Sequence, residues 1–266
     1  MNYGFIGVGN MAQAMLEGLH RKDMLKGHEF YLYDIDEGKK NTVAKKYNLN
    51  ALNSASNVAL TSDVVFLAIK PNQLHDLLVE LRQPVQRKMP VLVSLPVGIS
   101  MKTIEETLGY ETPIIRIVAN VNTEVFLSVT SFCGNDMVKE IKGHIKDNVA
   151  KLLESIGSVI ELDEKYFDIF TVIASSAPAF VIKFSESLAE AALKEGLPKD
   201  IARNIIADMI HGTGKMLSVN NPTAISDRIC SPGGTTIVGL TALTAGGFEA
   251  AVHRAAAECM DRLRRE

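Results

Sequence analysis

Two glycines near the start of the chain have the spacing of a phosphate-binding turn. They belong to the segment Gly7-Val8-Gly9-Asn10-Met11-Ala12, which follows a strand-like run and opens a helical stripe of apolar residues. In such a turn the first glycine permits the tight bend, the second lets the backbone approach a pyrophosphate, and Ala12 keeps the helix close to the strand. Free amides at the start of the helix face the anion. The segment therefore predicts a dinucleotide site.

An acidic residue, Asp34, stands at the end of the next strand-like run. A carboxylate at this position accepts a hydrogen bond from the 2′-hydroxyl of the cofactor ribose and repels a 2′-phosphate. Asp34 therefore favours NADH over NADPH. Two alternatives stay open: Asp34 is a solvated turn carboxylate, or Lys39 or Lys40 holds a 2′-phosphate beside it.

The third strand-like run ends in Ala68-Ile69-Lys70-Pro71-Asn72. Doubly wound sheets bind ligands at the carboxyl edge of their strands. We therefore expect Ala68, Lys70 and Pro71 to border the cofactor, with Pro71 stopping the strand and Lys70 lying over the ligand. A turn proline beside a surface lysine is the alternative.

A second chemically suggestive segment lies near the other end of the chain, in the loop Cys230-Ser231-Pro232-Gly233-Gly234-Thr235-Thr236. Two adjacent glycines followed by two hydroxyl residues form a backbone that can turn its amides onto a carboxylate. The loop stands between helical patterns. It predicts a binding site for a small acid.

The elements that must position these loops change in kind along the chain. Up to about residue 160, short apolar runs alternate with helical patterns, which predicts an α/β fold with a doubly wound parallel sheet. The runs are Gly4–Ile6, Phe30–Tyr33, Val64–Ile69, Val91–Ser94, Ile114–Val118 and Val159–Leu162. Beyond Glu164 three long helical patterns follow, with apolar stripes that begin at Val181, Ile201 and Val252. We therefore predict a dinucleotide-binding domain over residues 1–163 and an all-helical domain over residues 164–266.

Composition narrows the class of function. The 266 residues carry a formal net charge of -3 with no long block of one sign, which disfavours a nucleic-acid groove or a membrane-surface helix. The three cysteines are far apart and have no metal-ligand or redox spacing, so we expect no metal and reduced thiols. No targeting segment is recognised, and the apolar runs look too short or too interrupted to span a membrane. We expect a cytoplasmic protein that acts on a small molecule.

With these motifs in place, the chain resembles the pyrroline-5-carboxylate reductases nearly from end to end. The most specific match is the substrate loop, which reads S-P-G-G-T-T in that family, as it does at 231–236 here. The other matches are the glycine turn, the strand end at Ala68-Ile69-Lys70-Pro71, Ser94 and Gly98, Pro178-Ala179-Phe180, and Glu186. The resemblance implies a Rossmann-type domain followed by an all-helical dimerisation domain. It also implies reduction of 1-pyrroline-5-carboxylate to L-proline by hydride transfer from NADPH or NADH, a step of proline biosynthesis.

The resemblance also implies roles for single residues. The amides of Gly233, Gly234 and Thr235 and the hydroxyl of Ser231 would hold the substrate carboxylate. Thr236 is the candidate hydrogen-bond donor to the ring nitrogen. Because a threonine is a poor acid, it would orient an already protonated iminium, or a water, rather than supply the proton.

The chain departs from the family pattern beside the expected nicotinamide. The family's M-P-N-T-P is Val118-Ala119-Asn120-Val121-Asn122 here, which keeps Asn120 as a cofactor contact but loses both prolines, so we expect a looser loop. The family's G-S-G-P-A-Y is Ser175-Ser176-Ala177-Pro178-Ala179-Phe180. Asp208-Met209 replaces a Q-T pair, and Val97 replaces an alanine. These changes either alter the rate, the accepted substrate size or both, or they are neutral drift within a working enzyme.

Two other functions stay open at this point. The chain could reduce another cyclic imine or a small acid of the β-hydroxyacid dehydrogenase type, for which Lys183 is the nearest candidate acid, although we expect it to face solvent. It could also be a non-catalytic paralogue that binds the cofactor. In each case the apolar helical stripes would be exposed on a lone chain, which predicts a homodimer and allows a higher assembly of dimers.

Overall fold

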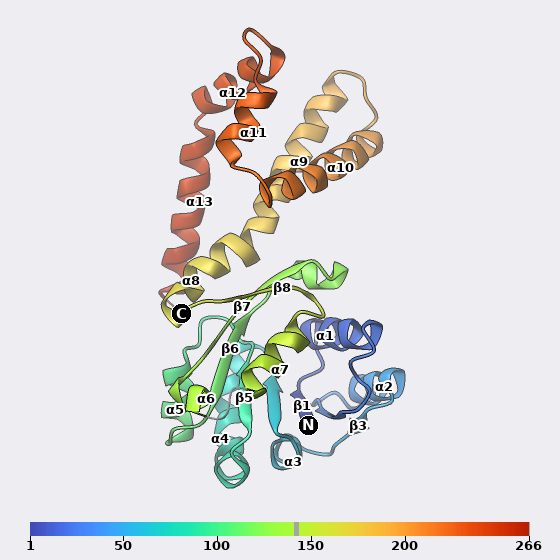
Figure 1. Cartoon of the computed structure of the whole chain (residues 1–266), viewed down its shortest axis with the longest axis vertical. Coiled ribbons are helices and arrows are strands. Elements are labelled where there is room, and N and C mark those ends of the chain that lie inside the picture. Colours follow the sequence, from blue (N-terminus) through green and yellow to red (C-terminus); the bar gives the residue numbers. More distant parts are fainter. Residues whose placement is uncertain (141–143, 266) are drawn as a thin grey trace. The chain divides into compact units, whose positions relative to one another are not determined.

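The computed structural model describes residues 1–140 and 144–265, which form two compact units divided between Ser175 and Ser176 (Figure 1). The boundary that we expected after residue 163 stays a prediction. Residues 164–175, which lie between the expected and the observed boundary, are helical, as expected of the second domain. Their side chains Phe167 and Phe170, however, are buried in a core cluster of the first unit.

The first unit is built on an eight-stranded sheet in the order β3-β2-β1-β4-β5-β6-β7-β8. The strands are β1 (Asn2–Ile6), β2 (Glu29–Tyr33), β3 (Asn50–Ala51), β4 (Val64–Leu67), β5 (Val91–Ser94), β6 (Ile114–Val118), β7 (Ser128–Gly134) and β8 (Gly157–Glu161). The chain runs outward from β1 to β3, then returns to β4 on the other side of β1. The expected doubly wound, Rossmann-type sheet is confirmed, with its topological switch point between β1 and β4.

Two strands of the sheet were not predicted from the sequence. Strand β3 has only two residues, and β7 pairs antiparallel with β6, so the sheet is not wholly parallel as we had expected. Hydroxyl side chains explain why β7 was missed, since Ser128, Thr130 and Ser131 are buried in it and no apolar run marks the strand. A buried strand can thus be polar when its backbone is paired on both sides, as β7 is by β6 and β8.

Helices cover both faces of the sheet and enclose two separate cores. On one face α1 (Asn10–Arg21), α2 (Glu37–Tyr47), α6 (Asp136–Glu140) and α7 (His144–Leu153) pack on a cluster that includes Phe5 and Phe66, whose rings stack at 4.6 Å. On the other face lie α3 (Ala55–Thr61), α4 (Pro71–Lys88), α5 (Met101–Leu108) and α8 (Phe167–Phe170). Strand β4 is apolar and buried at every position because both faces of the sheet are covered.

The second unit is helical, as expected. It contains α9 (Ala177–Lys194), α10 (Lys199–Leu217), α11 (Pro222–Ile229), α12 (Thr235–Ala245) and α13 (Phe248–Leu263), of which α11 and α12 were not among the three long helical patterns. Helices α9 and α10 pack through Ala189, Ala202 and Ile206, and Arg203 donates two hydrogen bonds of 2.8 Å to the Glu186 carboxylate. This small core leaves many large apolar side chains exposed, including Ile182, Leu193, Ile205, Met209, Val238 and Leu240.

One expectation about apolar runs is wrong. In the described part of the chain, the helical run Glu164–Lys194 is long enough to span a membrane and contains an 18-residue stretch with a mean hydropathy of 1.5, so it passes by length and composition. The bent pair α12 and α13 would pass the same test together. Pro178 lies in the first turn of α9, a position at which proline is tolerated, so it does not end the helical run.

Candidate active site

The turn between β1 and α1 has the backbone that the sequence predicted. Gly7 has a φ of +92°, and a Cβ atom there would lie 2.5 Å from the carbonyl oxygen of Ala68 on the adjoining strand end. At Gly9 a Cβ atom would meet only that same oxygen, at 4.0 Å. Gly7 is therefore required by the fold, whereas the bare backbone at Gly9 leaves an open approach for a ligand.

The start of α1 offers unpaired donors beside this open backbone. Gly9 is the N-cap residue and no side chain caps the helix. In the described chain the amides of Asn10, Met11 and Ala12 have no hydrogen-bond partner, because the first backbone bond of the helix runs from the Gln13 amide to the Gly9 carbonyl, at 2.9 Å. Val8 and Ala12 are fully buried and anchor the turn. These observations fit a pyrophosphate held by backbone amides.

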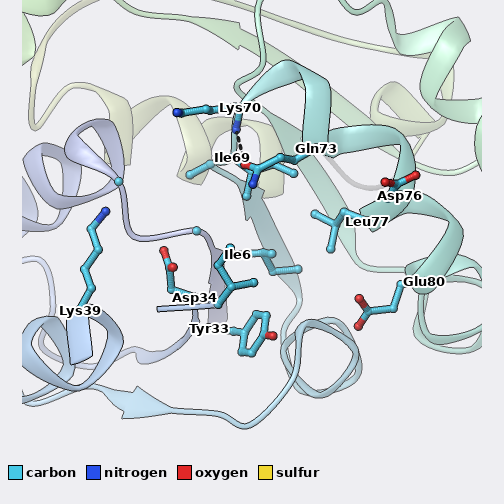
Figure 2. Close-up of a pocket in the computed structure, with 14 residues that line it drawn as sticks. Ile6, Tyr33, Asp34, Lys39, Ile69, Lys70, Gln73, Asp76, Leu77 and Glu80 are labelled. Carbon is cyan, nitrogen blue, oxygen red and sulfur yellow. Dashed lines mark hydrogen bonds between the residues drawn. The ribbon is translucent and has the colours of Figure 1, made fainter. Parts of the chain in front are cut away.

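A cavity of about 380 Å³ opens beside the glycine turn, at the switch point of the sheet (Figure 2). It collects residues from the ends of three strands that are separated in sequence: Ile6, Gly7 and Gly9 at the end of β1, Tyr33, Asp34 and Ile35 at the end of β2, and Ala68, Ile69 and Lys70 after β4. Helix α4 closes the other side with Gln73, Asp76, Leu77 and Glu80. The structure thus brings together the predicted cofactor residues Gly7, Gly9, Asp34, Ala68 and Lys70.

The Asp34 carboxylate accepts hydrogen bonds from two backbone amides. Its Oδ2 atom accepts a hydrogen bond from the Val8 amide at 2.7 Å, and its Oδ1 atom accepts one from the Asp36 amide at 2.9 Å. Asp34 is half-buried and bonded to the glycine turn, which favours the role of a ribose partner over that of a solvated turn carboxylate. Its carboxylate ties the end of β2 to the glycine turn and stays at a fixed place in the cavity wall.

The two lysines that follow Asp34, Lys39 and Lys40, differ in whether their side chains can reach the cavity. Lys40 is 2% exposed, and its Nζ atom donates to Glu37 at 2.6 Å and to the Leu52 carbonyl at 3.2 Å. Lys40 thus lies inside the fold and is not available to a 2′-phosphate. Lys39 does line the cavity and extends beside Asp34 (Figure 2).

The end of β4 is shorter than expected. The strand stops at Leu67, two residues before the predicted end, and Lys70 is the N-cap residue of α4. Pro71 is the first residue of that helix, so it starts α4 rather than merely ending the strand. Lys70 is among the residues that line the cavity, whereas Pro71 is exposed and is not among them.

Asn120 lies outside the residues that line the cavity. It is 5% exposed, and its Nδ2 atom donates to the Ala174 carbonyl at 2.9 Å. Its Oδ1 atom is buried and has no partner in the described chain. Ala174 belongs to the π-helical turn Thr171–Ser176, a feature that the sequence did not reveal and that is frequent at functional sites.

The loop Ser231–Thr236 forms a compact turn in the second unit. Gly233 has a φ of +70°, and the Gly234 amide donates to the Ser231 carbonyl at 3.0 Å, so this amide is already used within the turn. Gly234 is also the N-cap residue of α12, which begins at Thr235. Within the described residues the amides of Gly233, Thr235 and Thr236 have no partner, and they stand at a helix N-terminus that favours an anion.

The loop is also tightly packed on itself. A Cβ atom at Gly234 would lie 2.4 Å from the Ser231 Oγ atom, so only glycine lets the hydroxyl approach the backbone. Ser231 and Thr235 are exposed and Thr236 is half-buried. The loop belongs to the second unit of the chain and the cofactor cavity to the first, and each is formed by residues of its own unit.

Comparisons with known proteins find relatives of both the dinucleotide-binding domain and the helical domain. Residues 164–266 match the family model described as pyrroline-5-carboxylate reductase dimerisation, and residues 2–98 match NADP oxidoreductase coenzyme F420-dependent. The chain is 31% identical over 261 residues to the pyrroline-5-carboxylate reductase of Escherichia coli (strain K12), covering 97% of this chain and 96% of that protein. The chain belongs to the pyrroline-5-carboxylate reductase family.

Solved structures of family members superpose over the whole chain. The 1-pyrroline-5-carboxylate reductase of Streptococcus pyogenes has a TM-score of 0.87 at 31% identity and covers 100% of this chain and 99% of its own. The Plasmodium falciparum pyrroline carboxylate reductase, solved with NADP bound, has a TM-score of 0.86 at 28% identity and covers 100% of this chain and 97% of its own. The expected fold and family are thereby confirmed.

The departures from the pattern of the pyrroline-5-carboxylate reductases now have a local structure. The segment after β6, which we expected to loosen without its prolines, forms the 3-10 helix η1 (Val121–Val125). The Thr123 hydroxyl donates to the Asn120 carbonyl at 2.6 Å, and the Ser175 hydroxyl donates to the Ala119 carbonyl at 3.3 Å. Hydrogen bonds thus hold this loop, and Ser175, which replaces a family glycine, supplies one of them.

Glu186, one of the family matches, is a structural ion-pair partner in this chain. Hydrogen bonds from Arg203 and Lys199 lower the pKa of its carboxyl to about 2.

Burial raises the pKa of the Cys133 thiol to about 12, so it stays protonated and unreactive. Lys183, the candidate acid of the alternative reductase reading, is exposed on the second unit, as we expected. Among the described residues no cluster of metal ligands occurs.

Proposed function

We propose that this chain reduces the ring imine of 1-pyrroline-5-carboxylate to L-proline, with NADPH or NADH as the hydride donor. The observation that carries the proposal is the loop Ser231–Thr236, which presents unpaired amides at the N-terminus of α12 in a chain that covers 96% of a named reductase. The cavity beside the glycine turn supports the cofactor part of the proposal.

The cofactor residues act by binding and orientation. The amides of Asn10, Met11 and Ala12 hold the pyrophosphate, and Gly9 lets it approach the backbone. Lys70 and Ala68 border the cofactor at the end of β4. When bound, the reduced nicotinamide supplies the hydride. Asn120 stays a proposed contact on the nicotinamide side, supported by its buried and unpaired Oδ1 atom.

The substrate loop binds the carboxylate of the imine acid. The free amides of Gly233 and Thr235, with the Ser231 hydroxyl, donate to the carboxylate oxygens, and the positive end of α12 adds to this attraction. The Thr236 hydroxyl orients the protonated ring nitrogen. Hydride addition to the imine carbon turns the carbon–nitrogen double bond into a single bond, and the nitrogen keeps its proton as an amine.

The second unit supports a proposed homodimer. Its core is small, while large apolar side chains along α9, α10 and α12 are exposed on the single chain. The proposed functional boundary after residue 163 is supported by the match of residues 164–266 to a dimerisation family. We expect light scattering at micromolar concentration to give at least twice the monomer mass, and a monomer would contradict the proposal. A higher assembly and a cytoplasmic location stay proposals.

The test of the activity is initial-rate kinetics with purified protein. Pyrroline-5-carboxylate and its six-membered ring homologue are each supplied with NADH and with NADPH, and oxidation of the nicotinamide is followed by absorbance. Faster turnover of the five-membered ring, with proline as product, is the expected result. Oxidation of the cofactor only with the larger ring would move the proposal to another imine. Tight cofactor binding with no turnover would indicate a non-catalytic paralogue.

A further inference from the structure

We propose that Asp34 makes the cofactor cavity selective for NADH over NADPH. This inference rests on the proposed function only in taking a nicotinamide dinucleotide as the ligand. It concerns binding at the ribose of the adenosine half, so it can be tested without any imine substrate.

The first observation is that the Asp34 carboxylate is held in place. The Val8 and Asp36 amides each donate to a different oxygen of this group, at 2.7 Å and 2.9 Å. A carboxylate has about four acceptor positions, so roughly two remain to accept hydrogen bonds from ribose hydroxyls. Because a backbone amide holds each of its two oxygens, the carboxylate cannot rotate away from a 2′-phosphate without breaking these bonds.

The second observation is the balance of charge around the cavity. Its described lining carries the carboxylates Asp34, Asp76 and Glu80 against the ammonium groups of Lys39 and Lys70, so acidic groups are in excess (Figure 2). A phosphate monoester adds a charge of about -1.5 to -2 at neutral pH. The cavity is therefore matched to a neutral ribose hydroxyl and not to a 2′-phosphate.

The third observation is the residue that follows Asp34. Sites that accept a 2′-phosphate place an arginine nearby. Here the position is Ile35, which lines the cavity and is 78% exposed, so it offers apolar surface for a base and no donor for a phosphate. Lys40, the other cation near this turn, is turned into the fold. Lys39 is left as the one described cation on the Asp34 side of the cavity.

The test measures dissociation constants of NADH and NADPH for the full chain. The protein has no tryptophan, so the fluorescence of the reduced nicotinamide, or calorimetry, reports binding. We expect the parent protein to bind NADH about tenfold more tightly than NADPH, or more, which corresponds to about 1.4 kcal/mol. Asp34→Ser should remove this preference by weakening NADH and strengthening NADPH.

Three further variants keep the inference falsifiable. Ile35→Arg leaves Asp34 and its two amides intact and should strengthen NADPH alone, which covers the case in which Asp34→Ser fails to fold. Glu80→Gln removes a carboxylate from the far side of the same cavity and should change the preference much less than Asp34→Ser. Lys39→Ala should weaken both cofactors to a similar extent in the parent background.

Several results would overturn the inference. They are a parent protein that binds NADPH as tightly as NADH, an Asp34→Ser variant that loses both cofactors equally, an equal effect of Glu80→Gln, or a selective loss of NADPH in Lys39→Ala. None of these depends on proline formation. A protein that binds NADH selectively but reduces no imine would refute the proposed function and leave this inference standing.

Discussion

An added methyl group should lower the stability of the protein at Gly7 and its affinity for the cofactor at Gly9, the two glycines of the β1–α1 turn. At Gly7 alanine would keep a φ near +92°, which is unfavourable for a residue with a side chain, and its Cβ atom would lie 2.5 Å from the Ala68 carbonyl oxygen. The left-handed backbone alone costs about 1–2 kcal/mol. At Gly9 the φ is -67° and the nearest atom is 4.0 Å away, so Gly9→Ala introduces no comparable strain.

The clash at Gly7 adds to the conformational cost. Because the blocking atom belongs to the backbone of the neighbouring strand end, relief requires the ends of β1 and β4 to move apart. Overpacking by an added methyl group costs about 1–3 kcal/mol, so Gly7→Ala should lose about 2–5 kcal/mol in total. Gly27→Ala serves as the matched control, since Gly27 has a φ of +78° with no atom within 4 Å of an added Cβ. It should show the conformational part alone.

The assay combines denaturant unfolding with cofactor titration at one fixed protein concentration, because an oligomer's apparent stability depends on concentration. Gly7→Ala should be clearly less stable than Gly27→Ala. Gly9→Ala should keep the parent stability and lose cofactor affinity by more than about tenfold, since its methyl group occupies the approach to the pyrophosphate. Parent-like affinity in Gly9→Ala would refute the assignment of the turn, and parent-like stability in Gly7→Ala would refute the steric argument.

Three further predictions follow from other parts of the chain. Thr236→Ala should lower kcat about 10²-fold with a smaller change in KM, and Thr236→Ser should recover part of the loss; an unchanged kcat would exclude the hydroxyl from the reaction. Because the pKa of Glu186 is lowered to about 2 from an ordinary 4.5, its stabilising effect is full above pH 4.5 and is lost as the pH falls toward 2; Glu186→Gln should therefore flatten acid unfolding over that window, and an unchanged pH profile would contradict this. The Arg116 guanidinium lies 2.9 Å from Glu164 with only 6% of its side chain exposed, so Glu164→Gln should cost roughly 3 kcal/mol in unfolding free energy, and a cost near zero would show that the pair is not desolvated.

The sequence predicted the parts of this fold whose physical signal is local. Continuous apolar runs marked the buried strands from β1 to β6, apart from the two-residue β3, because strands covered on both faces need apolar residues at successive positions. The glycine turn was predictable because a φ of +92° and a Cβ contact of 2.5 Å leave glycine as the fitting residue. The substrate loop also carries a local signal, because Gly233 has a φ of +70° and Gly234 packs closely against Ser231.

Features that depend on distant partners were not predictable. Strand β7 is polar and is paired with β6 and β8, so its own residues carry no pattern that predicts a strand. Lys39 and Lys40 are adjacent and chemically identical, yet one lines the cavity and the other is buried against Glu37 and Leu52. The two amides on Asp34 likewise join segments that only the folded sheet brings together.

The uneven cores of the two units also bear on how the protein is made. The first unit precedes the second along the chain and carries its own apolar interior, so it can acquire its fold, including the glycine turn, before the second unit has been synthesised. The second unit has a core that centres on Ala189, Ala202 and Ile206, and the apolar faces of its helices remain uncovered. Its maturation therefore depends on meeting another chain, and the yield of competent protein should rise with the rate of expression instead of being fixed by the single molecule.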